Sequence, residues 1–156
     1  MELAARVGTQ RGVRDHGRPV LLATLRVPFE PRAAAFAVDS AVESGEPLLV
    51  VNVVELPPLG MSVAMHYDQL PDTPEDAETL RAPAEVARAL GVHVERLRVK
   101  SPRPIEALLE LTAERSPGLL VLGPDRRRLK RRAYRKAAKA VRERAACLVW
   151  LSPSEG

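Results

Sequence analysis

Short apolar runs alternate with helix-like stretches along this chain of 156 residues, and this alternation constrains its fold more than any other feature. Five runs predict strands, at residues 19–25, 47–56, 92–99, 118–123 and 147–151. The first two are continuous and rich in Val and Leu, which is typical of strands buried on both faces of a sheet. The third alternates apolar and polar residues, as a partly exposed strand does. Strands separated by helices predict an α/β fold in which a mainly parallel, five-stranded sheet carries helices on both faces.

Helical periodicity fills the segments between these strands. Apolar residues recur at helical spacing over residues 32–44 and 104–116. A further helix is expected at residues 75–90, where Thr73 is a suitable N-cap and acidic residues occupy the first turn. Pro83 interrupts that segment, so we expect either a kinked helix or two short helices.

A strongly basic segment gives the chain its positive charge. The formal net charge is +4, but residues 126–144 contain eleven Lys and Arg and one acidic residue, Glu143, for a local charge of +10. The rest of the chain, with 13 basic and 19 acidic residues, carries −6. A narrow apolar stripe within the segment predicts a fourth helix, and the stripe consists of Leu129, Ala133, Ala137, Ala140 and Val141.

Basic side chains on this helix form a second stripe. They recur at i, i+4, i+7, i+11 and i+14 and therefore lie along one face: Arg128, Arg132, Arg135, Lys139 and Arg142. One hypothesis is that this stripe, with Arg127, is an anion surface for nucleic acid, nucleotide phosphates or an acidic partner. The alternative is a solvated helix that pairs with the acidic remainder of the chain or with a partner subunit. Arg126, Arg127 and Arg128 are expected in the first turns of the helix, where cations are disfavoured, so at least one of them should contact an anionic group.

Signatures of catalysis and of membrane insertion are lacking. The one cysteine, Cys147, excludes an intrachain disulfide and a multi-cysteine metal site. The chain has no nucleophile elbow, P-loop or zinc-protease motif, and its three histidines have no ligand spacing, so no catalytic or metal-binding residue is assigned. Its longest apolar run is seven residues, whereas roughly 20 are needed to span a bilayer. We expect a cytoplasmic protein with a flexible leader at residues 1–17 and one domain at residues 18–153.

Several strings, taken in their order and spacing, resemble the universal stress protein family. RPVLLATL (18–25) is similar to the family's first strand and LLVVNVVE (48–55) to its second. Residues 98–123 resemble its run from the third to the fourth strand, and RAACLVWLSP (144–153) resembles its closing strand. The resemblance implies a Rossmann-like fold of the adenine nucleotide alpha hydrolase type with strand order 3-2-1-4-5. It also implies a homodimer joined through the fifth strand, and an apolar edge strand independently favours pairing; the strand comprises Cys147, Leu148, Val149, Trp150 and Leu151.

The same resemblance indicates where a nucleotide would bind. The matching positions are Thr24, Leu25, Val53, Leu122, Gly123, Arg126, Arg135 and Lys136. ATP-binding members carry an Asp where this chain has Leu25, and three glycines after the fourth strand whose backbone amides cradle phosphates. Gly123 matches the first glycine, Arg126 the second, and Arg135 or Lys136 the third. Because a Cβ blocks close approach of the backbone, these replacements imply a member that does not bind ATP in the family's manner.

We therefore predict a non-enzymatic, dimeric binding or scaffold protein of the stress response, with no cofactor. One alternative is a nucleotide such as ATP or AMP, or another phosphate ligand, in the crevice after the first and fourth strands. Arginine side chains would then replace the glycine amides. A second alternative is that the basic helix binds nucleic acid or an acidic protein, which salt-dependent binding to a generic oligonucleotide would reveal.

Overall fold

The computed structural model describes residues 18–56 and 74–152, so the expected leader at residues 1–17 and the Thr73 cap lie outside the described part. The described strands are β1 (Val20–Thr24), β2 (Leu48–Glu55), β3 (Val94–Ser101), β4 (Leu119–Leu122) and β5 (Leu148–Leu151). They alternate with the helices α3 (Pro31–Ser44), α5 (Pro74–Ala89), α6 (Pro104–Arg115) and α7 (Arg131–Arg144). The predicted third strand is therefore displaced by two residues, while the others agree closely.

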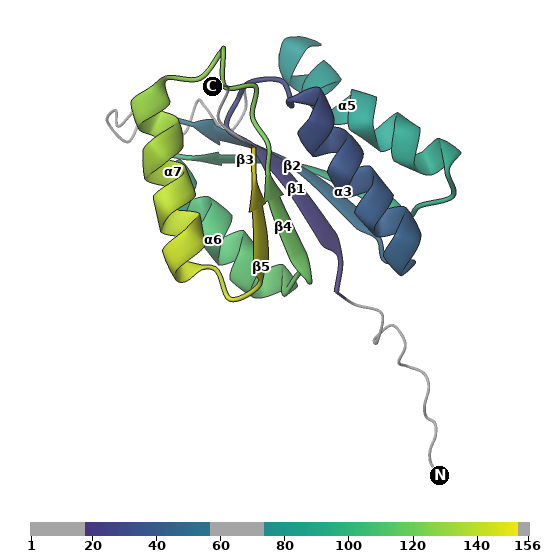
Figure 1. Ribbon diagram of the computed structural model, residues 1–156. Coiled ribbons are helices and arrows are strands. Elements are labelled where there is room, and N and C mark those ends of the chain that lie inside the picture. The colour runs from purple at the N-terminus through teal and green to yellow at the C-terminus, as the bar shows by residue number, and fades with distance from the viewer. Residues whose placement is uncertain (1–17, 57–73, 153–156) are drawn as a thin grey trace.

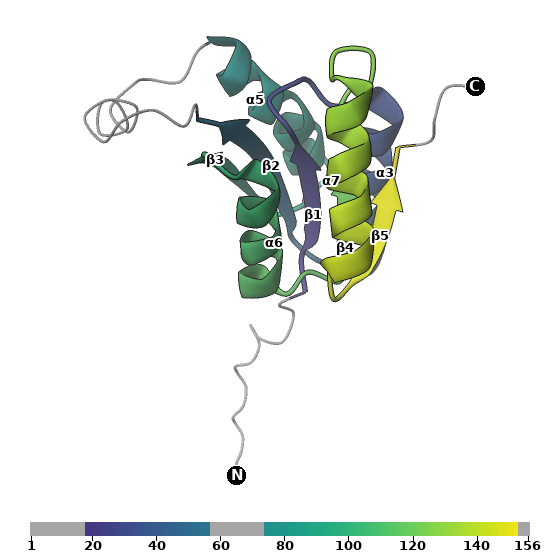
Figure 2. The same ribbon diagram turned by 90° about the vertical axis from the view of Figure 1, so that its left-hand side faces the viewer.

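The five strands form one parallel sheet in the order β3-β2-β1-β4-β5. Helices α3 and α5 cover one face of the sheet, and α6 and α7 cover the other (Figure 1). The carboxyl ends of the strands meet at one edge of the sheet, uppermost in Figure 2. The predicted fold class and strand order are thus confirmed.

Alternating side chains in the central strand divide the core into two layers. In β1, Leu21 and Ala23 pack towards α6 and α7, whereas Val20 and Leu22 pack towards α3 and α5, because successive side chains of a strand point to opposite faces. All four are buried. Leu25, which follows β1, packs in the same layer as Leu21 and Ala23, towards α6 and α7.

The helix ends follow local signals. Helix α3 begins at Pro31 because the Glu30 carboxylate accepts hydrogen bonds from two backbone N–H groups of its first turn. It ends at Gly45, whose φ of 73° is the left-handed conformation that glycine tolerates. Of the two expectations for the next helix, that of two short helices is wrong, because residues 74–89 form one helix, α5, with Pro83 buried inside it.

The start of α7 differs from the expectation. Arg126, Arg127 and Arg128 precede the helix in a turn, because the Asp125 carboxylate accepts the Arg127 N–H and the Asp125 carbonyl accepts the Arg128 N–H. The basic stripe on the helix is therefore one residue shorter than predicted. The apolar stripe also shifts: Ala133 is exposed, while a larger side chain, that of Tyr134, is buried.

Candidate functional site

A cleft of about 890 Å³ opens between α6 and α7, beyond the carboxyl ends of β1 and β2. Leu25 and Val53 line its inner end and also pack against the core of this face. Residues 102–106, at the start of α6, form one wall. The other wall consists of Leu129, just before α7, and of Ala133, Lys136, Ala140 and Arg144 on α7. Parallel α/β sheets bind ligands at this edge, which makes the cleft the candidate site.

Two buried polar side chains fix the turn that presents Leu25 to the cleft. Thr24 and Asn52 lie beside each other in register and are completely buried. The Thr24 hydroxyl donates to the Val27 carbonyl at 2.7 Å, and Asn52 Oδ1 accepts the Arg26 N–H at 2.9 Å. The second bond holds Arg26 at a φ of 62°. Thr24 is thus a turn residue and not part of the cleft lining. The sequence analysis did not assign a role to Asn52, although it is the one polar residue within the apolar run of β2.

The charged side chains of the cleft leave an excess of cations. Glu106 accepts both hydrogen bonds of the Arg144 guanidinium, at 2.8 and 2.9 Å, and this pairing lowers the pKa of Glu106. Arg26, Arg103 and Lys136 also line the cleft, and none of the three forms an ion pair within the described part of the chain. Glu55 is the second carboxylate of the lining, so four cations face two anions there. The cleft therefore offers cationic side chains to an anionic ligand.

The positions that match the family's third glycine lie inside α7. The helix begins at Arg131, so the backbone N–H groups of Arg135 and Lys136 belong to the helical hydrogen-bond ladder. These amides are not free to bind a phosphate, and the site does not fit ATP held in the family's manner. Only the Lys136 side chain reaches the cleft, whereas that of Arg135 is exposed elsewhere on the helix.

Gly123, which the sequence interpretation assigned to phosphate binding, has a packing role. A Cβ built on Gly123 would lie 2.4 Å from the Cβ of Ala33, in the first turns of α3. Such a distance is too short for any residue with a side chain, so glycine is required whether or not a ligand binds. Leu122 and Gly123 are both buried and do not line the cleft.

Arg126 lies away from the cleft and stacks on α7. Its guanidinium carbon is 3.9 Å from the centre of the Tyr134 ring, within the range of a cation–π contact. Both side chains donate to the carbonyl of Ser152, Tyr134 at 3.2 Å and Arg126 at 3.4 Å. Burial raises the pKa of Tyr134. Arg126 also lines a small hollow of about 180 Å³ next to the start of α3, so it does not occupy the phosphate position of the cleft.

The other two arginines of the turn pair with acidic side chains. Arg127 contacts Asp125 at 3.3 Å, and Arg128 contacts Glu75 of α5 at 3.0 Å. The expectation that at least one of these arginines contacts an anionic group is confirmed, but its reasoning from a helix N-terminus is wrong. The Arg128–Glu75 pair borders a groove of about 580 Å³ between α3 and α5, which no pattern in the sequence indicates.

Strand β5 is an edge strand with two different faces. Val149 and Leu151 pack against the core beneath α7, as predicted for one alternating pair. Trp150 lies on the other face and stacks on Phe36 of α3, with ring centres 4.9 Å apart. Leu148 remains 74% exposed. Trp150 is therefore tied to its own chain, and Leu148 is the exposed apolar residue of this strand.

Potential metal ligands and the cysteine thiol are the other reactive groups of the described residues. No group of three His, Cys, Asp or Glu side chains among them could hold a metal ion. Cys147 is half-buried just before β5, and burial raises the pKa of its thiol, which reduces the reactive thiolate form. No described helix combines the length and the apolar composition that a membrane span requires.

Comparison with known proteins identifies the family. The model of the universal stress protein family matches residues 17–153, which is most of the chain. The chain belongs to the universal stress protein family. Comparison with curated proteins gives no significant match.

Solved structures of universal stress proteins share this fold at low sequence identity. A family member from Burkholderia pseudomallei is 19% identical with a TM-score of 0.63, and the match covers 89% of this chain and 98% of that one. A protein from Archaeoglobus fulgidus in complex with dAMP is 20% identical with a TM-score of 0.59, covering 86% and 96%. A protein from Arabidopsis thaliana with AMP bound is 17% identical with a TM-score of 0.59, covering 89% and 93%. At these identities the likeness establishes the fold.

Proposed function

We propose that this universal stress protein is a non-enzymatic binding protein whose cleft does not hold ATP through backbone amides. The main support is the position of α7, which begins at Arg131 and keeps the amides of Arg135 and Lys136 inside the helix. Leu25 adds support, because an aliphatic side chain offers no acceptor to an adenine or ribose donor. A lost partner of this kind typically costs about 1–3 kcal/mol. A role in the stress response and a cytoplasmic location, which rest on the family and on the sequence, are part of the proposal.

Calorimetric titration with Mg-ATP tests the main proposal. We expect no heat of binding at micromolar protein and physiological salt, while an ATP-binding family member titrated in parallel shows it. Native mass spectrometry of the purified protein should likewise detect no bound ATP or AMP. A micromolar dissociation constant for Mg-ATP would contradict the proposal.

A second candidate function uses the same cleft for a smaller phosphate-bearing ligand. Arg26, Arg103 and Lys136 line the cleft without ion-pair partners in the described residues, which supports recognition of an anion by side chains. Charge-assisted hydrogen bonds from such groups are stronger than neutral ones. AMP and dAMP, which solved family structures carry, are the natural first probes.

The second candidate is tested with two lysines on one helix. Lys136 lines the cleft, whereas Lys139 is exposed and is not among the lining residues. If AMP binds, Lys136→Gln should weaken the affinity by about tenfold, equivalent to about 1.4 kcal/mol. Lys139→Gln, which removes the same charge, should leave it unchanged at matched ionic strength. Equal effects of the two substitutions would show only general electrostatic attraction, and titration with inorganic phosphate separates recognition of the phosphate from that of the nucleoside.

We also propose that the protein is a homodimer joined through β5. Strand β5 pairs only with β4 among the described strands, so its outer edge presents backbone groups that another strand would satisfy. The exposed Leu148 on this strand supports the proposal.

A further inference from the structure

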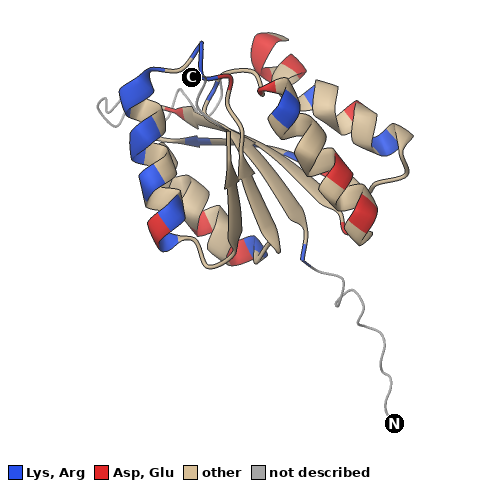
Figure 3. Cartoon of the chain, in the orientation of Figure 1, with Lys and Arg blue, Asp and Glu red and all other residues tan. Residues whose placement is uncertain are grey.

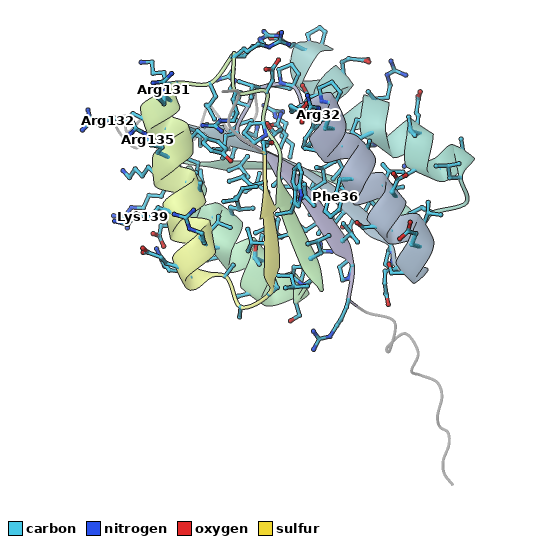
Figure 4. All side chains as sticks on the ribbon, in the orientation of Figure 1. Arg32, Phe36, Arg131, Arg132, Arg135 and Lys139 are labelled. Carbon is cyan, nitrogen blue, oxygen red and sulfur yellow. The ribbon has the colours of Figure 1, made fainter. Side chains whose placement is uncertain are left out.

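The outward side of α7 carries a row of cations that the cleft does not use. This α7 basic face consists of Arg131, Arg132, Arg135, Lys139 and Arg142, all of them exposed. Figure 3 shows Lys and Arg along the whole length of α7, with acidic residues concentrated on other helices. In Figure 4 the labelled members Arg131, Arg132, Arg135 and Lys139 project from the helix away from the sheet.

The α7 basic face has no acidic partner among the described residues. Within residues 18–56 and 74–152, none of its five side chains forms an ion pair, and Glu143 is the one acidic residue of the helix. The neighbouring Arg144 does pair, with Glu106 of α6. The members repeat at intervals of three or four residues, where like charges repel and destabilise a helix. Within the part of the chain that the structure describes, pairing with acidic residues, one of the two sequence interpretations, therefore does not neutralise this face.

The dimensions of the α7 basic face match a nucleic-acid strand. With a rise of 1.5 Å per residue, Arg131 and Arg142 lie about 16 Å apart along the axis. One strand of a duplex carries a phosphate every 3.4 Å of its axis, so about five phosphates occur over that length, and the long Lys and Arg side chains must spread to follow the winding strand. The helix is held rigidly against the sheet by its buried residues, including Tyr134, Ala138 and Val141. The row is therefore pre-formed and does not have to fold on binding.

Other polyanionic partners fit this surface less well. Stacking of single-stranded bases requires exposed rings beside the cations, but the one aromatic side chain of α7, that of Tyr134, is buried beneath Arg126. Phe36, which is 37% exposed, belongs to α3 and stacks on Trp150. An amphipathic helix binds a membrane by inserting its apolar face, and the apolar face of α7 is buried against the sheet. A contact that needs neither rings nor a free apolar face is one with the phosphate backbone of a duplex.

We propose that the α7 basic face binds the phosphate backbone of double-stranded nucleic acid without regard to base sequence. This goes beyond the proposed function, since the surface lies outside the cleft and uses none of the cations that line it. It predicts binding that depends steeply on salt and little on sequence, because each phosphate contact releases counterions.

Fluorescence anisotropy with labelled duplexes of mixed sequence tests the proposal. Duplex DNA and duplex RNA of about 20 base pairs are titrated over a range of KCl concentrations, with single-stranded DNA and poly-glutamate as comparison ligands. The test variant combines Arg132→Gln, Arg135→Gln and Lys139→Gln. The matched control combines Arg32→Gln, Arg88→Gln and Arg96→Gln, three exposed arginines outside α7 that form no ion pair in the described residues.

The salt slope gives a quantitative expectation. Five phosphate contacts predict a slope of about −4.5 in log affinity against log salt, hence a loss of about 500-fold between 50 and 200 mM. The test variant, with two contacts left, should show a slope of about −1.8 and a loss of about 12-fold. The control variant should keep the parent's slope and its affinity to within about twofold.

Several outcomes would overturn the proposal. No binding of either duplex at low salt would do so, as would equal losses in the test and control variants. Tighter binding of poly-glutamate than of duplex at equal charge concentration would indicate an acidic protein partner instead. Preference for the single strand would indicate base stacking. A difference between the DNA and RNA duplexes would not affect the surface assignment but would identify the natural ligand.

Discussion

Replacing Gly123 by alanine tests whether this glycine serves packing or a ligand. The added Cβ would lie 2.4 Å from the Cβ of Ala33, whereas carbon atoms in favourable contact are about 3.5–4.0 Å apart. Neither backbone moves freely. The Gly123 N–H donates to the Ala23 carbonyl and its own carbonyl accepts the Glu30 N–H, both at 2.9 Å, while Ala33 is fully buried in α3. Relief of the clash therefore requires α3 to shift from the sheet.

The expected cost follows from the size of the overlap. Overpacking a core by one methyl group typically costs about 1–3 kcal/mol. An overlap of more than about 1 Å between two backbone-anchored carbons belongs at the upper end, so we expect Gly123→Ala to lower the free energy of unfolding by about 2–3 kcal/mol. For a chain of this size that corresponds to a decrease of about 4–12 °C in the melting temperature.

Urea and thermal unfolding, followed by circular dichroism, measure the effect without any ligand. Gly118→Ala is the matched control, because a Cβ there would meet the nearest atom, the Cβ of Arg18, at 3.6 Å, an ordinary contact. Ala33→Gly alone should cost about 1 kcal/mol or more through helix propensity and the lost methyl. Combined with Gly123→Ala it should restore much of the loss, with a coupling energy of about 1–2 kcal/mol. Strict additivity, or a Gly123→Ala protein within about 0.5 kcal/mol of the parent, would refute the packing argument.

Two further predictions concern the ends of α7 and β5. Tyr134→Phe should cost about 0.5–1.5 kcal/mol in urea unfolding, because the hydrogen bond to the Ser152 carbonyl is lost. Burial raises the pKa of Tyr134 in the folded state. The contribution of the Tyr134 hydroxyl to the free energy of unfolding is therefore complete below the unfolded pKa of about 10 and is lost as the pH rises through the folded pKa. The parent should lose stability relative to Tyr134→Phe at high pH, and parallel pH profiles of the two proteins would contradict this. Sedimentation should show a dimer, and Leu148→Glu should weaken this dimer without changing the fold of the monomer. Trp150→Glu should in addition unfold the edge of the sheet, because it removes the stack on Phe36. A monomeric parent at micromolar concentration would contradict the β5 interface.

The predictable part of the candidate site is its location. Leu25, Val53 and Lys136, taken from the resemblance, do line one cleft. Their places follow from the predicted elements, because Leu25 comes directly after the first strand, Val53 lies near the end of the second strand and Lys136 lies on the last helix. Arg126 does not join them, since the Asp125 turn and the ring of Tyr134 direct it elsewhere. No pattern in the sequence reports such a contact.

The sequence by itself determined the succession of strands and helices. Apolar runs and helical periodicity are local properties, so the continuous run around Leu21 already predicts a strand buried on both faces, and the spacing within residues 32–44 predicts a helix. The resemblance added the order β3-β2-β1-β4-β5, which the structure confirms.

Tertiary structure alone decided which distant residues meet. Gly123 is required by Ala33, ninety positions earlier, and Arg128 is neutralised by Glu75, 53 positions earlier. The same holds for α7, where Arg144 pairs with Glu106 but the α7 basic face pairs with no acidic residue among those described. A charge or a glycine is visible in the sequence, but its effect depends on what lies within a few ångströms, and that distance is fixed only when the helices pack on the sheet.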